Sequence, residues 1–143
     1  MKMMTKKYEI IFKYIQDLSV EIPSAETFMI SREHITKYVL SININTKTLK
    51  NKMLEVLTKL TFKDPNENNK KCHFEILYAT VVKINDDKMQ KNELEKIILC
   101  DVQKEIYPGL EKILIRTIKD SGFPALKLDK KIDFDLLYRQ RTN

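Results

Sequence analysis

The chain has 143 residues, a formal net charge of +6 and 43% hydrophobic residues, with two glycines and no tryptophan. This length suits one domain, here expected over residues 1–143, and the hydrophobic content excludes an intrinsically disordered protein. No run of about 18 apolar residues is present, so no membrane-spanning helix is expected. Because Ile, Lys and Asn are heavily used, part of the positive charge reflects composition, and charge alone does not identify a partner.

The first strand is predicted over residues 8–22, and Pro23 ends it because proline has no N–H for a sheet. The mixed apolar phase at Ile10, Ile11 and Phe12 indicates a bend. Over DLSVEIP, residues 17–23, apolar and polar residues alternate strictly, as in a strand with one packed face. Leu18, Val20 and Ile22 are predicted to be packed, and Asp17, Ser19 and Glu21 to be exposed.

Residues 24–37 show no period and are predicted to form a connecting loop that carries Phe28, Met29 and Ile30. Strands are predicted over residues 39–46, 53–63 and 72–84. The polar segment 64–71 is predicted to join the last two as antiparallel neighbours. The packed sides are predicted to hold Leu40, Ile42, Ile44, Leu54, Val56, Leu60, Phe62, Phe74, Ile76 and Tyr78. The exposed sides include Lys59, Lys63, His73, Glu75 and Leu77.

After Asp87 the apolar spacing becomes that of a helix, and Asn92 with Glu95 is spaced like a capping box at its start. Pro108 and Gly109 are predicted to interrupt or kink this long helix. Its end is predicted at Gly122.

A short last helix is predicted to start after an N-cap at Asp133, with Ile132 and Leu137 placed as a hydrophobic staple. The predicted fold class is therefore α+β: a four-stranded antiparallel sheet followed by one long broken helix and one short helix packed on one face. The long helix is apolar on more than one side at Leu99, Cys100 and Ile115. This pattern favours burial against a second chain, and isolated exposed apolar residues are the alternative.

Few residues are available for catalysis or metal binding. Cys72 and Cys100 do not form a CxxC pair, and with His34 and His73 they are too few and too scattered for a dedicated metal site. Neighbouring side chains in a strand point to opposite faces, so Cys72 and His73 cannot cooperate directly. We expect no enzyme, no cofactor and no metal, in a reducing cytoplasmic setting. The scattered cations, without an arginine cluster or RNP-like aromatic stretch, favour a solvated surface over nucleic-acid binding.

Three stretches of the sequence resemble one family. YIQDLSVEIPSA, residues 14–25, is similar to the first-strand signature of the SecB family of bacterial preprotein-export chaperones. CDVQKEIYPGLEKIL, residues 100–114, and SGFPALKLDKKIDFDLLY, residues 121–138, resemble its later segments in the same order. The chain departs from the family pattern at Asp101, and residues 26–38 match poorly. The resemblance implies a single SecB-like domain, in a homotetramer that is a dimer of dimers with its long helices between two sheets.

The resemblance also implies functional residues. In the family, acidic residues on the outward sheet face dock the export motor SecA, and the matching positions here are Asp17, Glu21 and Glu75. An ordinary solvated strand face is the alternative for these carboxylates. Phe74, Ile76 and Tyr78 match positions that the family buries near its helices and subunit contacts, and core packing within one chain is the alternative.

The function implied is that of a holdase, which binds unfolded preproteins in the cytoplasm and delivers them to SecA. Such a protein needs apolar grooves rather than catalytic groups. Candidate peptide-binding residues are Phe28, Met29, Ile30 and Tyr38, unless these simply pack on the core. A SecB-like chaperone dedicated to another partner, such as a toxin–antitoxin pair, and a basic nucleic-acid-binding module are the alternative functions.

Overall fold

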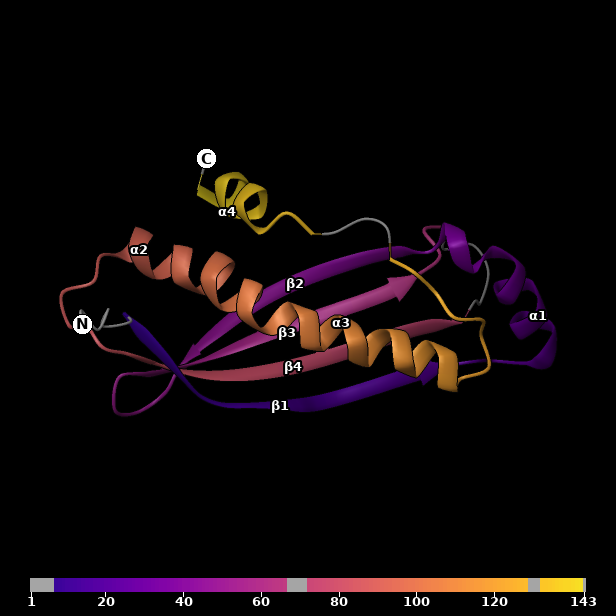
Figure 1. Ribbon diagram of the computed structural model, residues 1–143, viewed down its shortest axis with the longest axis horizontal. Helices are drawn as coiled ribbons and strands as arrows, with labels where there is room; N and C mark the ends of the chain where they lie inside the picture. The colour runs from indigo at the N-terminus through magenta and orange to yellow at the C-terminus, as the bar shows by residue number, and fades with distance from the viewer. Residues whose placement is uncertain (1–6, 67–71, 129–131, 143) are drawn as a thin grey trace, which may run out of the picture.

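The computed structural model describes residues 7–66, 72–128 and 132–142. They contain a four-stranded antiparallel sheet with helices packed against one face (Figure 1). The strands are β1 (Tyr8–Glu21), β2 (Val39–Thr48), β3 (Met53–Lys63) and β4 (His73–Ile84). Their order across the sheet is β1-β4-β3-β2, so β1 and β2 are the two edges. The predicted α+β class and the four predicted strands are confirmed.

Alternation along the strands divides the sheet into an inner face, under the helices, and an outer face. The antiparallel register places Leu60 opposite Ile76 and Phe62 opposite Phe74, so these side chains share the inner face. None of the four is more than 2% exposed. The predicted packed sides of β3 and β4 are therefore confirmed, and they form the centre of the hydrophobic core.

Two irregularities in β1 explain its mixed apolar phase. The pairing of β1 with β4 shifts register between Ile10 and Phe12 and again between Ile15 and Asp17. Each extra residue reverses the face to which the following side chains point. The second shift places Asp17 on the outer face.

The predicted packing of Leu18, Val20 and Ile22 is wrong within the single chain. Leu18 and Val20 do lie on the inner face, because their partners in β4 are Ile76 and Phe74. They nevertheless remain 44% and 38% exposed, and Ile22 is 38% exposed. The helices cover the middle strands, and the inner side of the β1 edge is left half open.

Residues 25–34 form helix α1 (Ala25–His34), followed by the short 3₁₀ helix η1 (Ile35–Lys37), where a loop was predicted. Ser24 is the N-cap, and its Oγ accepts a hydrogen bond of 3.1 Å from the Thr27 N–H. The pattern did not indicate this helix because its apolar residues do not share one face. Phe28 is half-buried while Met29 is exposed, and Ser31 is the residue of α1 that is fully buried.

The long helix runs without a gap through α2 (Lys91–Lys96), the π-helical η2 (Ile97–Asp101) and α3 (Val102–Asp120). The predicted interruption at Pro108 and Gly109 is wrong, since α3 continues through both residues and the irregular segment is η2. Pro108 is exposed, and so is Lys104, the residue whose carbonyl group loses its N–H partner there.

The start of the long helix also differs from the prediction, and its end agrees. Asn92 does not cap the helix, because the helix begins at Lys91 after Gln90. At the other end, Gly122 has a φ of 105° and its N–H donates to the Lys119 carbonyl at 3.1 Å. This left-handed residue is the predicted helix stop.

Helix α4 (Phe134–Thr142) lies beside η2 near one end of the sheet, whereas α1 lies at the other end (Figure 1). The predicted N-cap is confirmed, since Asp133 Oδ1 accepts a hydrogen bond of 3.0 Å from the Leu136 N–H.

The Cys100 thiol donates to the Phe134 carbonyl at 3.2 Å. Leu99 is 5% and Cys100 1% exposed, so this chain already buries both and they give no reason to expect a second chain.

Candidate functional site: an apolar groove and a charged sheet face

A groove of about 560 Å³ lies between η1, the first residues of β2, and the segment that joins α3 to α4. Most of its lining is apolar. The lining residues are Ile35, Thr36, Lys37, Tyr38, Val39, Leu40, Phe62, Leu126, Lys127, Leu128 and Ile132. The described chain therefore offers an open, largely hydrophobic surface next to the edge strand β2.

The floor of the groove is rigidly held. Tyr38 is 7% and Phe62 2% exposed, and their ring centroids are 5.3 Å apart. The Tyr38 hydroxyl donates a hydrogen bond of 2.8 Å to the Cys72 carbonyl, and the Cys72 N–H donates to Ser31 Oγ at 3.3 Å. Burial raises the pKa of Tyr38, so the hydroxyl stays protonated as a donor. The floor therefore needs little rearrangement to receive an apolar ligand.

A row of aromatic rings connects this floor to α1. Phe62 is followed by Phe74 at 6.2 Å between centroids, then by Phe123 at 5.5 Å and Phe28 at 4.9 Å. The contacts are tilted or edge-on, as aromatic pairs prefer. Phe28 thus packs on the core, which was the alternative given for it, and does not line the groove.

The structure separates the other predicted peptide-binding residues. Tyr38 belongs to the groove floor, whereas Met29 and Ile30 are 60% and 51% exposed on α1 and are absent from the groove lining. Sequence reasoning missed Leu126 and Leu128, which contribute the opposite wall. Their alternation around Lys127 was the available signal, since it is typical of an extended segment with one packed side.

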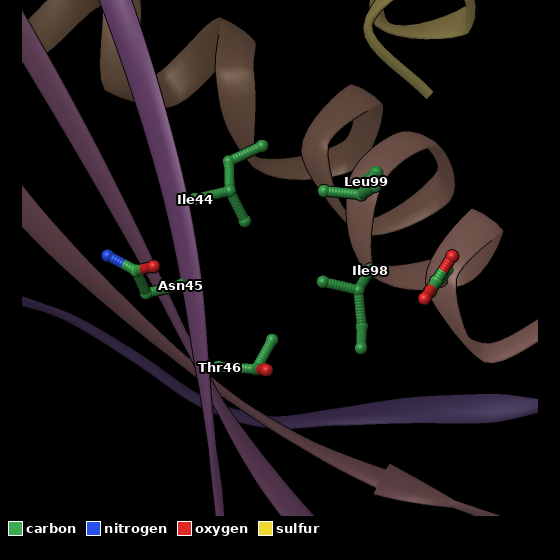
Figure 2. Close-up of a pocket in the computed structure, with 6 residues that line it drawn as sticks. Ile44, Asn45, Thr46, Ile98 and Leu99 are labelled. Atoms are coloured by element: carbon green, nitrogen blue, oxygen red, sulfur yellow. The ribbon is translucent and has the colours of Figure 1, made fainter. Parts of the chain in front are cut away.

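A second, smaller hollow of about 360 Å³ lies farther along β2, between that strand and the long helix. Figure 2 shows Ile44 and Thr46 pointing across it toward Ile98 and Leu99, while Asn45 points to the other side of the strand. The hollow begins four residues after Leu40, which is roughly 13 Å along an extended strand. Two hollows therefore follow the same sheet edge, the first mostly apolar and the second lined by both apolar and polar residues.

The outer face of the sheet brings together the three carboxylates predicted to dock a motor protein. Ser19 of β1 is paired with Glu75 of β4, so Asp17 and Glu21 are the diagonal neighbours of Glu75. Asp17 and Glu21 are exposed, and Glu75 is half-buried. The predicted exposure of this side of the first strand holds for both of its carboxylates.

Basic side chains from neighbouring strands lie against two of these carboxylates. Lys59 Nζ lies 2.9 Å from Glu75 Oε1, and His73 Nδ1 lies 3.3 Å from Glu21 Oε2. The side chain of Glu75 is 27% exposed, and that of Glu21 is 68% exposed. The face therefore carries an acidic edge at β1 and basic side chains on β3, and it is not uniformly acidic.

Phe74, Ile76 and Tyr78 of β4 pack in the core cluster that also contains residues of the long helix. Phe74 and Ile76 are 0% exposed within the single chain, so neither side chain has surface left for another subunit. Tyr78 is half-buried, and burial raises its pKa. Core packing is thus the role that these contacts support for Phe74 and Ile76.

Within the residues that the structure describes, no helix combines the length and hydrophobicity needed to cross a bilayer. The same residues contain no group of three His, Cys, Asp or Glu side chains arranged to hold a metal ion. A preformed apolar groove beside a sheet edge, with a charged sheet face behind it, is typical of proteins that bind other polypeptides.

The chain belongs to the SecB family: the family model "Preprotein translocase subunit SecB" matches residues 2–143. It is 49% identical over 140 residues to the "Putative protein-export protein SecB" of Pelagibacter ubique, covering 98% of this chain and 100% of that protein. It is 30% identical over 131 residues to the protein-export protein SecB of Rhodopseudomonas palustris, covering 92% of this chain and 78% of that protein. The family is one of export chaperones rather than enzymes.

A solved structure has the same fold. The SecB-like chaperone of Mycobacterium tuberculosis, in complex with a ChAD peptide from an antitoxin, matches with a TM-score of 0.66. The match covers 89% of this chain and 92% of that one, at 10% sequence identity. At this identity the likeness shows the fold alone, and it agrees with the predicted class.

Proposed function

We propose that this protein is a cytoplasmic holdase that binds unfolded preproteins and delivers them to the SecA motor for translocation. The observation that carries the proposal is the open groove of about 560 Å³, with its fixed aromatic floor and its apolar walls. Such a groove can hold an extended apolar segment without any chemical step. A holdase binds the unfolded state and so opposes its aggregation.

The groove accommodates many sequences because its recognition elements are not sequence-specific. The floor at Tyr38 and Phe62 offers aromatic surface, and the wall at Leu126 and Leu128 offers aliphatic surface. Both surfaces accept any apolar side chain of suitable size. The hollow at Ile44 and Ile98 gives the same client a second, weaker contact along β2.

The proposed assembly is a homotetramer, a dimer of dimers of single-domain chains. Its support is the edge strand β1, where five large apolar side chains and the adjacent Ile22 are between 38% and 62% exposed. A long apolar edge of this kind invites pairing with another chain. Several grooves on one assembly raise the effective concentration of each for a bound client.

The outer face is the proposed SecA-docking surface, through Asp17, Glu21 and Glu75. Changing all three to Lys is expected to abolish SecA binding without changing the mass of the assembly. SecA binding retained by this variant would remove the docking proposal. Glu75→Gln is the milder control, because it removes the carboxylate without placing a second positive charge beside Lys59.

The first experiment combines size-exclusion chromatography with light scattering, in the presence and absence of a permanently unfolded polypeptide. A tetramer that co-elutes with the polypeptide at both low and moderate salt is expected. A chain that elutes as a monomer and ignores the polypeptide would contradict the holdase proposal. Binding of a nucleic acid whose affinity falls steeply with salt would instead support the alternative of a basic nucleic-acid-binding module.

Matched variants locate the client site. Leu126→Ser with Leu128→Ser removes apolar surface from the groove wall and is expected to weaken binding of the polypeptide. Met29→Ser with Ile30→Ser removes exposed apolar surface from α1, outside the groove, and is expected to leave binding unchanged. Weakening by the α1 pair alone would assign the client site to α1, as the sequence suggested. Thermal unfolding of both variants controls for loss of the fold.

A chaperone dedicated to one other partner is the second candidate. The observation that favours it is the contact of Glu75 with Lys59 and of Glu21 with His73, since these contacts occupy two carboxylates of the proposed docking face. A protein that binds unfolded chains but not SecA, even when Lys59 and His73 are replaced by Gln, would support this candidate.

A further inference from the structure

The charged residues that line the groove are, within the described chain, Lys37 and Lys127. Lys37 is the last residue of η1, and Lys127 lies on the opposite wall between the two leucines of the α3–α4 segment. Both lysines are exposed, and neither forms an ion pair with a residue that the structure describes. The rim of the groove is therefore positively charged on two sides.

The interior below this rim has little to offer a charged ligand. Ile35 and Phe62 are each 2% exposed, and the Tyr38 hydroxyl is already bonded to the Cys72 carbonyl. The nearest buried carboxylate, Asp64, accepts a hydrogen bond of 2.9 Å from the Asn66 N–H and does not line the groove. Among the described residues of the lining, the charges that can act on a ligand are therefore those of Lys37 and Lys127.

We propose that the groove selects extended segments in which an apolar stretch is flanked by Asp or Glu, an inference that rests on the proposed holdase function. The apolar stretch occupies the floor and the flanking carboxylates meet the ammonium groups of Lys37 and Lys127. A segment with Lys or Arg flanks would instead bring positive charges next to Lys37 and Lys127, and this repulsion weakens binding. The net charge of +6 acts in the same direction by steering acidic segments toward the molecule.

The size of the preference follows from the exposure of the lysines. Two solvent-exposed ion pairs together change affinity by about three- to tenfold at low salt. The preference fades as salt shortens the Debye length from about 30 Å at 0.01 M to about 3 Å at 1 M. Apolar contacts with the floor persist across this range, so salt removes the selectivity and leaves the binding.

The test uses three fluorescent peptides with one common apolar core of about six residues, roughly 20 Å when extended. The core is flanked on both sides by two Glu, two Gln or two Lys residues, and binding is measured by fluorescence anisotropy. The wild-type protein is expected to bind the Glu-flanked peptide most tightly and the Lys-flanked peptide least tightly. Lys37→Glu with Lys127→Glu is expected to reverse this order.

A matched charge control separates the groove from the whole molecule. Lys88→Glu with Lys91→Glu lowers the net charge by the same amount, at the start of α2 and at the opposite end of the molecule from α1 (Figure 1). This variant is expected to keep the wild-type order of the three peptides. A reversal as large as that of the groove variant would overturn the inference.

The outcomes distinguish this inference from the function on which it rests. Equal affinities of the wild-type protein for all three peptides would overturn the charge selection and leave the holdase proposal standing. If the protein binds neither the Gln-flanked peptide nor the unfolded polypeptide, the holdase proposal itself is contradicted. The expected order at low salt, converging on one affinity at high salt, would support both.

Discussion

Thr58→Val and Thr80→Val make the same chemical change at two fully buried positions on the inner face of the sheet. We expect them to change the free energy of unfolding in opposite directions. Thr58 Oγ1 donates to Gln103 Oε1 at 3.1 Å and accepts from Gln103 Nε2 at 3.0 Å. The Thr80 hydroxyl has no hydrogen-bond partner among the described residues.

The magnitudes follow from these contacts. Valine at position 58 leaves Oε1 of the fully buried Gln103 side chain without its hydrogen-bond donor, which costs about 1–3 kcal/mol. Valine at position 80 removes an unpaired buried hydroxyl, which stabilises the fold by about 0.5–1 kcal/mol. Gln103 Nε2 also donates to the Ile98 carbonyl of η2 at 3.3 Å, so the same amide supports the π-helical segment.

Gln103→Leu completes a double-mutant cycle. Alone it leaves the Thr58 hydroxyl unpaired and is expected to cost about 2 kcal/mol. Combined with Thr58→Val it replaces both partners by apolar groups, so the double variant is expected to cost less than the sum of the single changes by at least about 1 kcal/mol.

The assay is equilibrium unfolding in urea at one fixed protomer concentration, because association contributes to apparent stability. An unchanged m-value in each variant is the control for an intact fold. Two findings would refute the reasoning. One is a destabilisation by Thr80→Val as large as that by Thr58→Val, and the other is strict additivity of Thr58→Val and Gln103→Leu.

Three further predictions test the helix ends and the contact of α4 with the long helix. Gly122→Ala is expected to lower the free energy of unfolding by about 1–2 kcal/mol, because φ is 105° and the new Cβ would lie 3.1 Å from the Phe28 ring. An unchanged midpoint of thermal unfolding would contradict this expectation. Burial, with the adjacent Asp135 carboxylate, raises the pKa of the Cys100 thiol to about 11. A thiol reagent at pH 8 should therefore modify Cys100 only after unfolding. Rapid labelling of Cys100 in the native protein would contradict the assigned burial. Lys104 donates a hydrogen bond to Asp135, and this bond holds the pKa of the Asp135 carboxyl below the ordinary 3.8. The pair therefore stabilises the fold at pH values above 3.8, and this stabilisation is lost as pH falls through the lowered pKa. The stability difference between wild type and Asp135→Asn should therefore be present at pH 7 and disappear in acid, and an equal difference at both would refute the assignment.

The sequence alone determined the elements whose signals are local. Alternation of apolar and polar side chains defined β2, β3 and β4 and their two faces, because in a strand this pattern depends only on neighbouring residues. Gly122 and Asp133 marked helix ends because their backbone and side-chain chemistry acts within one turn. The resemblance on residues 14–25, 100–114 and 121–138 pointed to the family that the comparisons then showed.

Only the tertiary structure decided which apolar rows are covered and which charges are paired. Leu18 and Val20 follow the pattern of packed residues, yet they stay half exposed because β1 is an edge strand that the helices do not cover. The strand order then brings Lys59 beside Glu75, which no spacing along the chain could reveal. The groove has the same origin. Its walls come from η1, β2 and the segment after α3, and residues so far apart in sequence form one surface only when the sheet and the long helix have placed them together.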